Sequence, residues 1–317
     1  MIILWCILGI IILSALGGVI YTWNLSGKIY TNLLVRETDD KWGRVCSFPE
    51  DKEYSEMYEQ ALSWKELYSD HMKPVSVVSD GLHLAGEYYD FGSDRAVIII
   101  PGRTESCLYS CYFAEPYRKS GLNVLTIDNR AHGLSEGKYP ALGFSEYRDL
   151  LAWGKMLNED FSIRQVYLHG ICIGASAALF ALCDKNCPSY MAGMVADGMY
   201  TTFFDSFKAH MIEDHHPVFP VAHEIMLRIY MNTGAKPISD GPVKRIGDLD
   251  RPILFLHSRE DTFSLPEKTE SLYNMCKAKK SIHFFDKGAH SRIRYKNTDE
   301  YDQQIIGFMR EGAERSN

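Results

Sequence analysis

The sequence lacks an excess of basic residues, low-complexity tracts and internal repeats. Its 317 residues carry a formal net charge of −7, and no stretch interleaves Arg or Lys with aromatic residues. Because binding of phosphates requires a basic face, this composition argues against a nucleic-acid partner. The length allows one large domain or two modest ones, with enough chain to bury a hydrophobic core.

Charge is also missing from the first 23 residues, MIILWCILGIIILSALGGVIYTW. A run of this length is sufficient to cross about 30 Å of hydrocarbon as a helix. A cleaved signal peptide is the alternative, but no basic residue precedes the apolar core and the run is longer than such a core. Tyr21 and Trp23 lie where interfacial aromatic residues occur. We therefore expect a transmembrane anchor helix at residues 1–25.

The flanks of this segment predict its orientation. Basic residues follow it on the C-terminal side, at Lys28, Arg36, Lys41 and Arg44. The positive-inside rule places this side in the cytoplasm. The eight cysteines show no framework spacing, and only Cys6 lies in the apolar segment, which suits a reducing compartment. We expect a single-pass protein of the cell membrane with its main domain in the cytoplasm.

The remaining chain predicts a tether with an amphipathic helix at residues 26–72 and one α/β domain at residues 73–317. Two short strands joined by a turn at Asp80-Gly81 open this domain. Apolar strand patterns then alternate with helical patterns, and strands are expected at 95–100, 122–128, 164–170, 192–198, 251–258 and 281–288. Such alternation specifies a mostly parallel sheet with helices on both faces.

Residues 199–245 interrupt this alternation. The segment is helical in pattern, rich in aromatic residues and Met, and broken by Pro217 and Pro220. An insertion of this kind over the carboxyl ends of the strands would form a cap that lines the substrate site. A longer crossover with additional packing helices is the alternative.

One turn carries the main candidate nucleophile. In YLHGICIGAS, at residues 167–176, an apolar strand pattern breaks at Gly170, and small residues typical of a helix follow Gly174. Glycines two positions before and after Cys172 allow a sharp strand-to-helix turn that exposes its side chain above the sheet. The N-terminus of the following helix favours a thiolate. We predict that Cys172 is a nucleophile; an ordinary buried thiol is the alternative, because buried cysteines are common.

A nucleophile of this kind needs a base, and the base needs an acid that orients it. Asp261 follows the strand at 251–258, and His290 follows the strand at 281–288. Loops at the carboxyl ends of neighbouring parallel strands converge, and the chain order nucleophile, acid, histidine is typical of this arrangement. We therefore predict a triad of Cys172, Asp261 and His290.

Other acidic and histidine residues are alternatives for these roles. Asp197, which ends the strand at 192–198, could orient the histidine instead, whereas Asp286 comes too early in its strand. His257 and His169 are expected to be structural. The remaining histidines of the cap segment match no H-E-x-x-H pattern, so we expect no metal and no cofactor at His210, His215, His216 and His223.

Acyl chemistry also requires donors for a developing oxyanion. The N–H of Ile173, directly after Cys172, is one candidate. The second is expected in the loop after the strand at 95–100, which reads PGRTES. Arg103 is the expected donor and Thr104 the alternative, because Pro101 has no N–H.

These motifs resemble those of the bacterial α/β-hydrolases of the lysophospholipase and monoacylglycerol-lipase type (serine aminopeptidase S33-like), in particular a Gram-positive subgroup with an N-terminal anchor helix. The similar pieces cover roughly Pro74 to Met309 in consistent order: SDGLHLAGEYY, PGRTES, DNRAHGLSEGKY, GFSEYRDLLAW, GICIGASA, VADGMYTTF, LFLHSREDTFSLPEKTESLYN and GAHSRIRYKNTDEYDQQIIGF.

The resemblance implies the α/β-hydrolase fold with a helical cap and assigns roles to five residues: nucleophile Cys172, acid Asp261, base His290, and oxyanion donors Arg103 and Ile173. The chain departs from the family at two places. Pro101-Gly102 stands where the family usually has His-Gly, and cysteine stands where serine is expected. Dienelactone hydrolases and polyhydroxyalkanoate synthases also carry G-x-C-x-G on this fold, so a thiol is compatible with activity.

A thiol nucleophile would form a thioester acyl-enzyme. We expect hydrolysis of an ester or thioester. By analogy at the level of the fold, the substrate is expected to be a small molecule with an apolar acyl or lipid-like portion, reached near the membrane. Because a thioester also reacts with amines and thiols, transfer to another acceptor is the first alternative. The second is a hydrolase fold without catalysis that binds a ligand or a protein partner.

Overall fold

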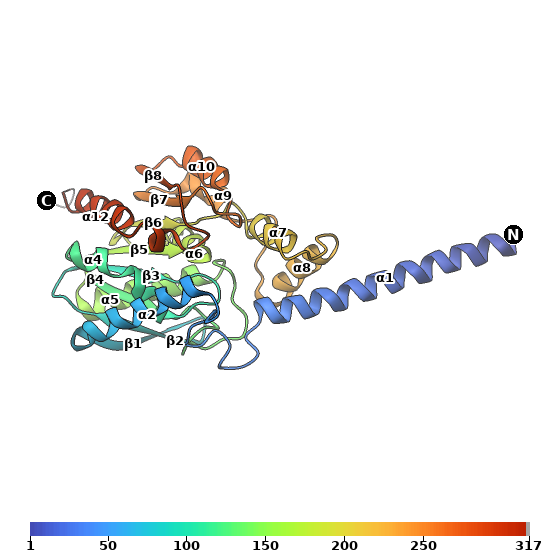
Figure 1. Cartoon of the computed structure of the whole chain (residues 1–317), viewed down its shortest axis with the longest axis horizontal. Coiled ribbons are helices and arrows are strands. Elements are labelled where there is room, and N and C mark those ends of the chain that lie inside the picture. Colours follow the sequence, from blue (N-terminus) through green and yellow to red (C-terminus); the bar gives the residue numbers. More distant parts are fainter. Residues whose placement is uncertain (315–317) are drawn as a thin grey trace.

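The computed structural model describes residues 1–314, and within them an eight-stranded sheet runs in the order β1-β2-β4-β3-β5-β6-β7-β8 (Figure 1). The β1/β2 and β2/β4 pairs are antiparallel, and the other neighbouring pairs are parallel. The strands are β1 (Met72–Ser79), β2 (Leu82–Tyr89), β3 (Arg95–Ile100), β4 (Asn123–Ile127), β5 (Gln165–Ile171), β6 (Met191–Asp197), β7 (Ile253–Ser258) and β8 (Lys280–Phe285). The expected mostly parallel sheet is confirmed, with small shifts at the strand ends.

The described residues also form twelve α-helices, most of which cover the two faces of this sheet. They are α1 (Ile2–Leu34), α2 (Lys52–Leu67), α3 (Cys107–Ser110), α4 (Glu115–Lys119), α5 (Glu146–Phe161), α6 (Ile173–Leu182), α7 (Phe203–Glu213), α8 (Val221–Thr233), α9 (Pro242–Arg245), α10 (Pro266–Met275), α11 (Ile293–Lys296) and α12 (Thr298–Glu314), with short 3₁₀ turns at Ser69–His71, Cys111–Phe113 and Ile246–Asp248.

The central strands are apolar throughout because both of their faces are buried. In β3, Ile98 packs into the core beneath α5 and α6, whereas Val97 and Ile99 pack into the opposite core beneath α2, α4 and α12. Alternate side chains of one strand therefore serve two separate cores, which explains the continuous run RAVIII.

The segment expected as a cap, residues 199–245, contains α7, α8 and α9 between β6 and β7. Apolar residues of α7 and α8 form a third core with Leu142 and Ile173. Ile173 directly follows the candidate nucleophile, so these helices lie next to the carboxyl end of β5.

The N-terminal helix α1 projects from the domain as a long rod (Figure 1). Among the described residues it is the one helix long and apolar enough to cross a membrane, a property that an anchor and a signal sequence share. We expected the anchor helix to end at residue 25, whereas α1 continues to Leu34. Its last turns therefore belong to the domain rather than to a tether.

Contacts with the cap explain why α1 continues. Ile29 and Leu34 are buried in the third core. The guanidinium of Arg228 in α8 donates to the carbonyl oxygen of Trp23 at 2.7 Å and lies over its ring. Tertiary packing of this kind stabilises helical turns that local helix propensity alone would not stabilise.

This packing predicts unequal effects along α1. Leu34→Ala removes a side chain that is 2% exposed, so we expect a loss of about 2–4 kcal/mol in the free energy of unfolding. Leu4→Ala, at a position that is 70% exposed in the same helix, is the matched control and should leave the stability of the domain unchanged. Thermal and chemical unfolding of the full chain in detergent measures both; equal stability of the two variants would mean that α1 does not brace the cap.

Candidate active site

Cys172 lies between β5 and α6 on a strained turn. Its φ of 54° and ψ of −111° are rare for a residue with a side chain. A Cβ added at Gly170 would lie 2.3 Å from the backbone nitrogen of Ala175, and one at Gly174 would lie 2.4 Å from the carbonyl oxygen of Ile100. The close approach of strand and helix therefore requires both glycines, as predicted, and it leaves Cys172 partly exposed.

Asp261 and His290 meet at the carboxyl end of the sheet, in the loops after β7 and β8. His290 Nδ1 lies 2.7 Å from Asp261 Oδ2. The other carboxylate oxygen, Oδ1, accepts from the N–H groups of Phe263 and Ser264 at 2.9 and 2.8 Å. Burial by itself would raise the pKa of Asp261, but His290 and these bonds hold it below its ordinary value.

His290 lies between Asp261 and Cys172. Burial would lower the pKa of His290, but the Asp261 carboxylate that bonds to the ring and the nearby Cys172 sulfur raise it well above its ordinary value. The His290 side chain is 12% exposed. Asp261 is in direct contact with His290, and Cys172 and His290 line one cavity. The structure thus places close together three residues that are 89 and 29 positions apart along the chain.

Asp197, the alternative orienting acid, makes a different contact. Its Oδ2 accepts from the Tyr301 hydroxyl at 2.7 Å, and within residues 1–314 its Oδ1 has no hydrogen-bond partner. Burial raises the pKa of Asp197 to about 7. The geometry therefore favours Asp261, whose carboxylate is the one bonded to His290.

Two further histidines, which we expected to be structural, are fully buried. His257 Nδ1 lies 2.9 Å from the Thr269 hydroxyl, and its Nε2 bonds to the carbonyl oxygen of Ser264. This ring also lies 3.6 Å from Asp261 Oδ2 and packs behind that carboxylate. His169 Nε2 contacts the Tyr301 hydroxyl at 3.1 Å, away from the sulfur.

The two expected oxyanion donors border Cys172. Within the described part of the chain, the N–H groups of Arg103 and Ile173 donate no hydrogen bond, whereas Thr104 N–H donates to His132 Nε2 at 3.3 Å. Gly102 lies close enough that an added Cβ would be 3.9 Å from Cys172 Cβ. The geometry favours Arg103 over Thr104 because the Thr104 donor is already used.

A cavity of about 300 Å³ is lined by Cys172 and His290, and its lining also includes residues that the sequence analysis did not predict. Glu105 and Tyr54 line it from the PGRTES loop and from α2. His210, expected at the surface or in the cap, also lines it and stacks on Phe263 with ring centroids 3.7 Å apart. Burial and the Arg103 charge lower the pKa of His210 to about 3, so the ring is neutral.

A second cavity of about 390 Å³ adjoins the first. The two share five lining residues: Phe48, Arg103, Thr104, His210 and Phe263. From there the second cavity reaches Leu33 at the end of α1 and Met211 in α7. The candidate site therefore extends from Cys172 Sγ to the C-terminal end of α1.

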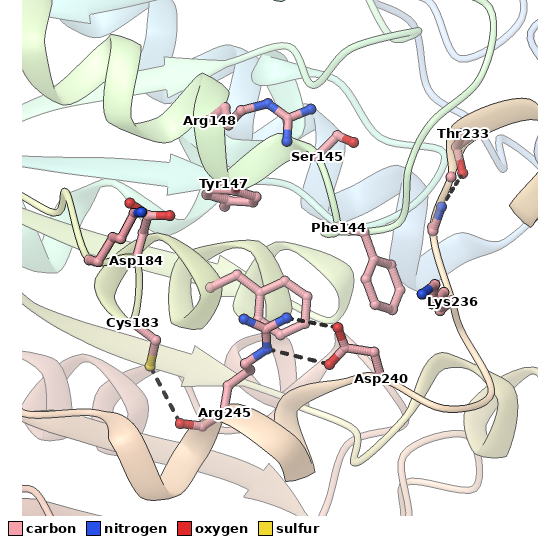
Figure 2. A pocket seen from close by; sticks show the side chains of 14 residues that line it. Phe144, Ser145, Tyr147, Arg148, Cys183, Asp184, Thr233, Lys236, Asp240 and Arg245 are labelled. Atoms are coloured by element: carbon pink, nitrogen blue, oxygen red, sulfur yellow. Dashed lines mark hydrogen bonds and ion pairs between the residues drawn. The ribbon is translucent and has the colours of Figure 1, made fainter.

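A larger cavity, of about 590 Å³, lies elsewhere, between α5, α6 and the segment after α8 (Figure 2). It contains none of the predicted catalytic residues. Two of its cations are paired with carboxylates, Arg245 with Asp240 and Arg148 with Asp80. The Cys183 thiol lines this cavity and donates to the carbonyl oxygen of Arg245 at 3.5 Å, and no histidine of the described residues lines it. Among residues 1–314, no group of three or more His, Cys, Asp or Glu side chains is placed to hold a metal ion.

The sheet order, the strand-to-helix turn and the loops after β7 and β8 together define the α/β-hydrolase fold, and the chain has this fold. In agreement, the family described as alpha/beta hydrolase fold matches residues 95–218.

Individual proteins show the same similarity. The uncharacterized protein YqkD of Bacillus subtilis (strain 168) is 28% identical over 223 residues, which cover 68% of this chain and 71% of that protein. The solved structure of the esterase Pf2001 of Pyrococcus furiosus superposes with a TM-score of 0.67 at 24% identity and covers 78% of this chain and 93% of its own. A structure of DcsB in complex with its substrate analogue gives a TM-score of 0.63 at 19% identity, covering 76% and 99%.

The buried carboxyl group of Asp197 predicts a pH dependence of stability. Its pKa is about 7 in the folded protein and about 4 in the unfolded chain. Between these values the unfolded chain releases a proton that the folded protein keeps, so stability falls as the pH rises from about 4 to about 7. Asp197→Asn removes this contribution, worth up to about 4 kcal/mol at pH 8.

Chemical unfolding at pH 5 and pH 8 measures this effect. We expect Asp197→Asn to be more stable than the parent protein at pH 8 and to differ less from it at pH 5. Asp286→Asn, at a carboxylate that is 92% exposed, is the control and should follow the parent at both values. A parent protein that gains stability relative to Asp197→Asn on going to pH 8 would contradict the assignment.

Proposed function

We propose that the protein is an acyl hydrolase that cleaves an ester or a thioester through Cys172, His290 and Asp261. The observation that carries the proposal is that His290, bonded to the Asp261 carboxylate at 2.7 Å, lines one cavity with the partly exposed Cys172. The esterase among its structural neighbours is consistent with this class of reaction.

The proposed reaction begins with attack of the Cys172 sulfur on the acyl carbon. His290 holds the thiol proton, and the Asp261 carboxylate stabilises the charged ring. The carbonyl oxygen becomes an oxyanion that accepts from Arg103 N–H and Ile173 N–H. His290 then donates the proton to the leaving alcohol or thiol, and a thioester remains on Cys172. Water, deprotonated by His290, attacks this thioester and releases the acid.

The substrate that fits this site has an apolar acyl portion. Apolar side chains line the cavity that adjoins the sulfur, namely Leu33, Trp42, Phe48, Phe207, Met211 and Phe263. Burial of apolar groups against such side chains contributes about 25 cal/mol per Å² of apolar surface. Transfer of the acyl group to an amine or a thiol is the second candidate function, because the sulfur nucleophile would give a thioester that reacts with both.

The test uses the full chain in detergent with p-nitrophenyl esters and acyl thioesters of increasing chain length. Intact-mass measurement should detect one acyl group on the parent protein and none on Cys172→Ala. His290→Ala should reduce turnover by on the order of 10³-fold because the base is lost. Cys183→Ala is the matched control, since this thiol is partly exposed but lines the cavity of about 590 Å³, which His290 does not line.

Four outcomes separate the candidate functions. An adduct that water clears supports hydrolysis, whereas faster clearance with added amines and formation of the amide supports transfer. Equal turnover by Cys172→Ala and the parent protein would contradict the proposal. The absence of any adduct on either protein would favour a binding role without catalysis.

We also propose that α1 is a retained membrane anchor and that the domain lies in the cytoplasm. Burial of Ile29 and Leu34 against the cap supports retention of α1, and the basic residues after the apolar run support the orientation. The protein expressed in bacteria should stay in the membrane fraction after carbonate extraction. Protease should spare the domain in intact spheroplasts and digest it after lysis. Digestion in intact spheroplasts would contradict the orientation.

A further inference from the structure

The loop that carries the expected oxyanion donor, residues 101–106, is held by chain that precedes the sheet. Arg103 Nη1 donates to the carbonyl oxygen of Leu33, at the end of α1, at 2.9 Å. The Ser47 hydroxyl donates to the carbonyl oxygen of Thr104 at 2.6 Å. Thr104 itself has a φ of 78°, so the loop is in a conformation that needs such support.

Glu105 connects this loop to α2. The side chain is buried, with the residue 6% exposed. Its Oε1 accepts from the Tyr54 hydroxyl, and its Oε2 accepts from Gly102 N–H at 3.2 Å. Gly102 immediately precedes Arg103, so one carboxylate joins the Tyr54 hydroxyl to the backbone at the expected oxyanion donor. A buried carboxylate without these donors would be strongly destabilised.

The same end of α2 also contacts the loop of His290. The Tyr54 ring stacks on Tyr109, with centroids 5.0 Å apart, and the Tyr109 hydroxyl donates to the carbonyl oxygen of Ser291 at 3.3 Å. Asp51, which caps α2 by accepting from Tyr54 N–H, pairs with Arg292 at 2.6 Å. Helix α2 therefore touches the two loops on either side of Cys172.

We propose that Tyr54 and Glu105 form a positioning pair that holds the Gly102–Arg103 backbone against Cys172, so that the segment ahead of the sheet is part of the active site. This inference rests on the proposed acyl chemistry at Cys172. Neither side chain reacts in it: Tyr54 fixes the Glu105 carboxylate, and the carboxylate fixes the direction of the backbone N–H groups. Small displacements of an oxyanion donor are costly, because stabilisation of the oxyanion depends on a donor distance of about 3 Å.

Tyr54→Phe tests the pair with little change in shape. We expect the rate of acylation of Cys172 by p-nitrophenyl acetate to fall about 10- to 100-fold, with KM changed by less than about threefold because the lining of the cavity is kept. Glu105→Gln should reduce acylation by a similar factor, since its amide nitrogen cannot accept a hydrogen bond. Alkylation of Cys172 by iodoacetamide should stay at the parental rate in both variants, because that reaction forms no oxyanion.

Tyr58→Phe is the matched control. Tyr58 lies one turn further along α2, and its hydroxyl donates to the carbonyl oxygen of Arg44 at 3.2 Å rather than to the loop. This variant should keep the parental acylation rate. If Tyr54→Phe also keeps that rate, the positioning role is wrong. The same follows if acylation and alkylation fall together, since this pattern indicates a general loss of structure.

A second readout separates this inference from the proposed function. If the parent protein is never acylated, the acyl chemistry has failed, and amide hydrogen exchange of residues 101–106 then tests the pair directly. Exchange that is at least about tenfold faster in Tyr54→Phe than in Tyr58→Phe supports the pair. Equal exchange in the two variants overturns it.

Discussion

The close packing of α6 against the ends of β5 and β3 is the constraint on which the site depends. No side chain fits at Gly170 or Gly174, because neighbouring backbone atoms lie within 2.4 Å of where a Cβ would be. The chain can therefore pass from strand to helix only through a residue with a positive φ, and Cys172 takes that position. The turn presents the sulfur at the edge of the sheet where the loops of Asp261 and His290 also end, so all other features of the site are arranged around it.

Three carboxyl groups near this edge illustrate how environment separates chemical roles. Asp261 accepts two backbone N–H bonds and contacts His290, which lowers its pKa and keeps it charged. Burial raises the pKa of Asp197 and of Glu105 to about 7, because fewer groups compensate their charge. A charged acid beside an imidazole can orient it and stabilise its protonated form. The other two are suited to holding neighbouring groups in place.

Much of the fold and the three candidate catalytic residues could be predicted from the sequence, because local sequence patterns indicate both. The glycines around Cys172 and the apolar runs before Asp261 and His290 are short signals with a direct structural meaning. The contributions of Tyr54 and Glu105 could not be predicted in this way. Tyr54 belongs to an amphipathic helix, and this pattern predicts only that the helix packs against the domain. The Tyr54 hydroxyl can donate to Glu105 only because α2 lies against the loop after β3 in the folded protein.

The sequence by itself determined the class of fold, the turn at Cys172 and the order of the three candidate catalytic groups, because periodicity and glycine spacing act within a few residues. Tertiary structure decided which acid contacts His290, where α1 ends, and how the cavity extends towards Leu33. These features depend on contacts between segments far apart in the chain. Burial and hydrogen bonding at such contacts have no local pattern, so they arise only when the sheet brings the segments together.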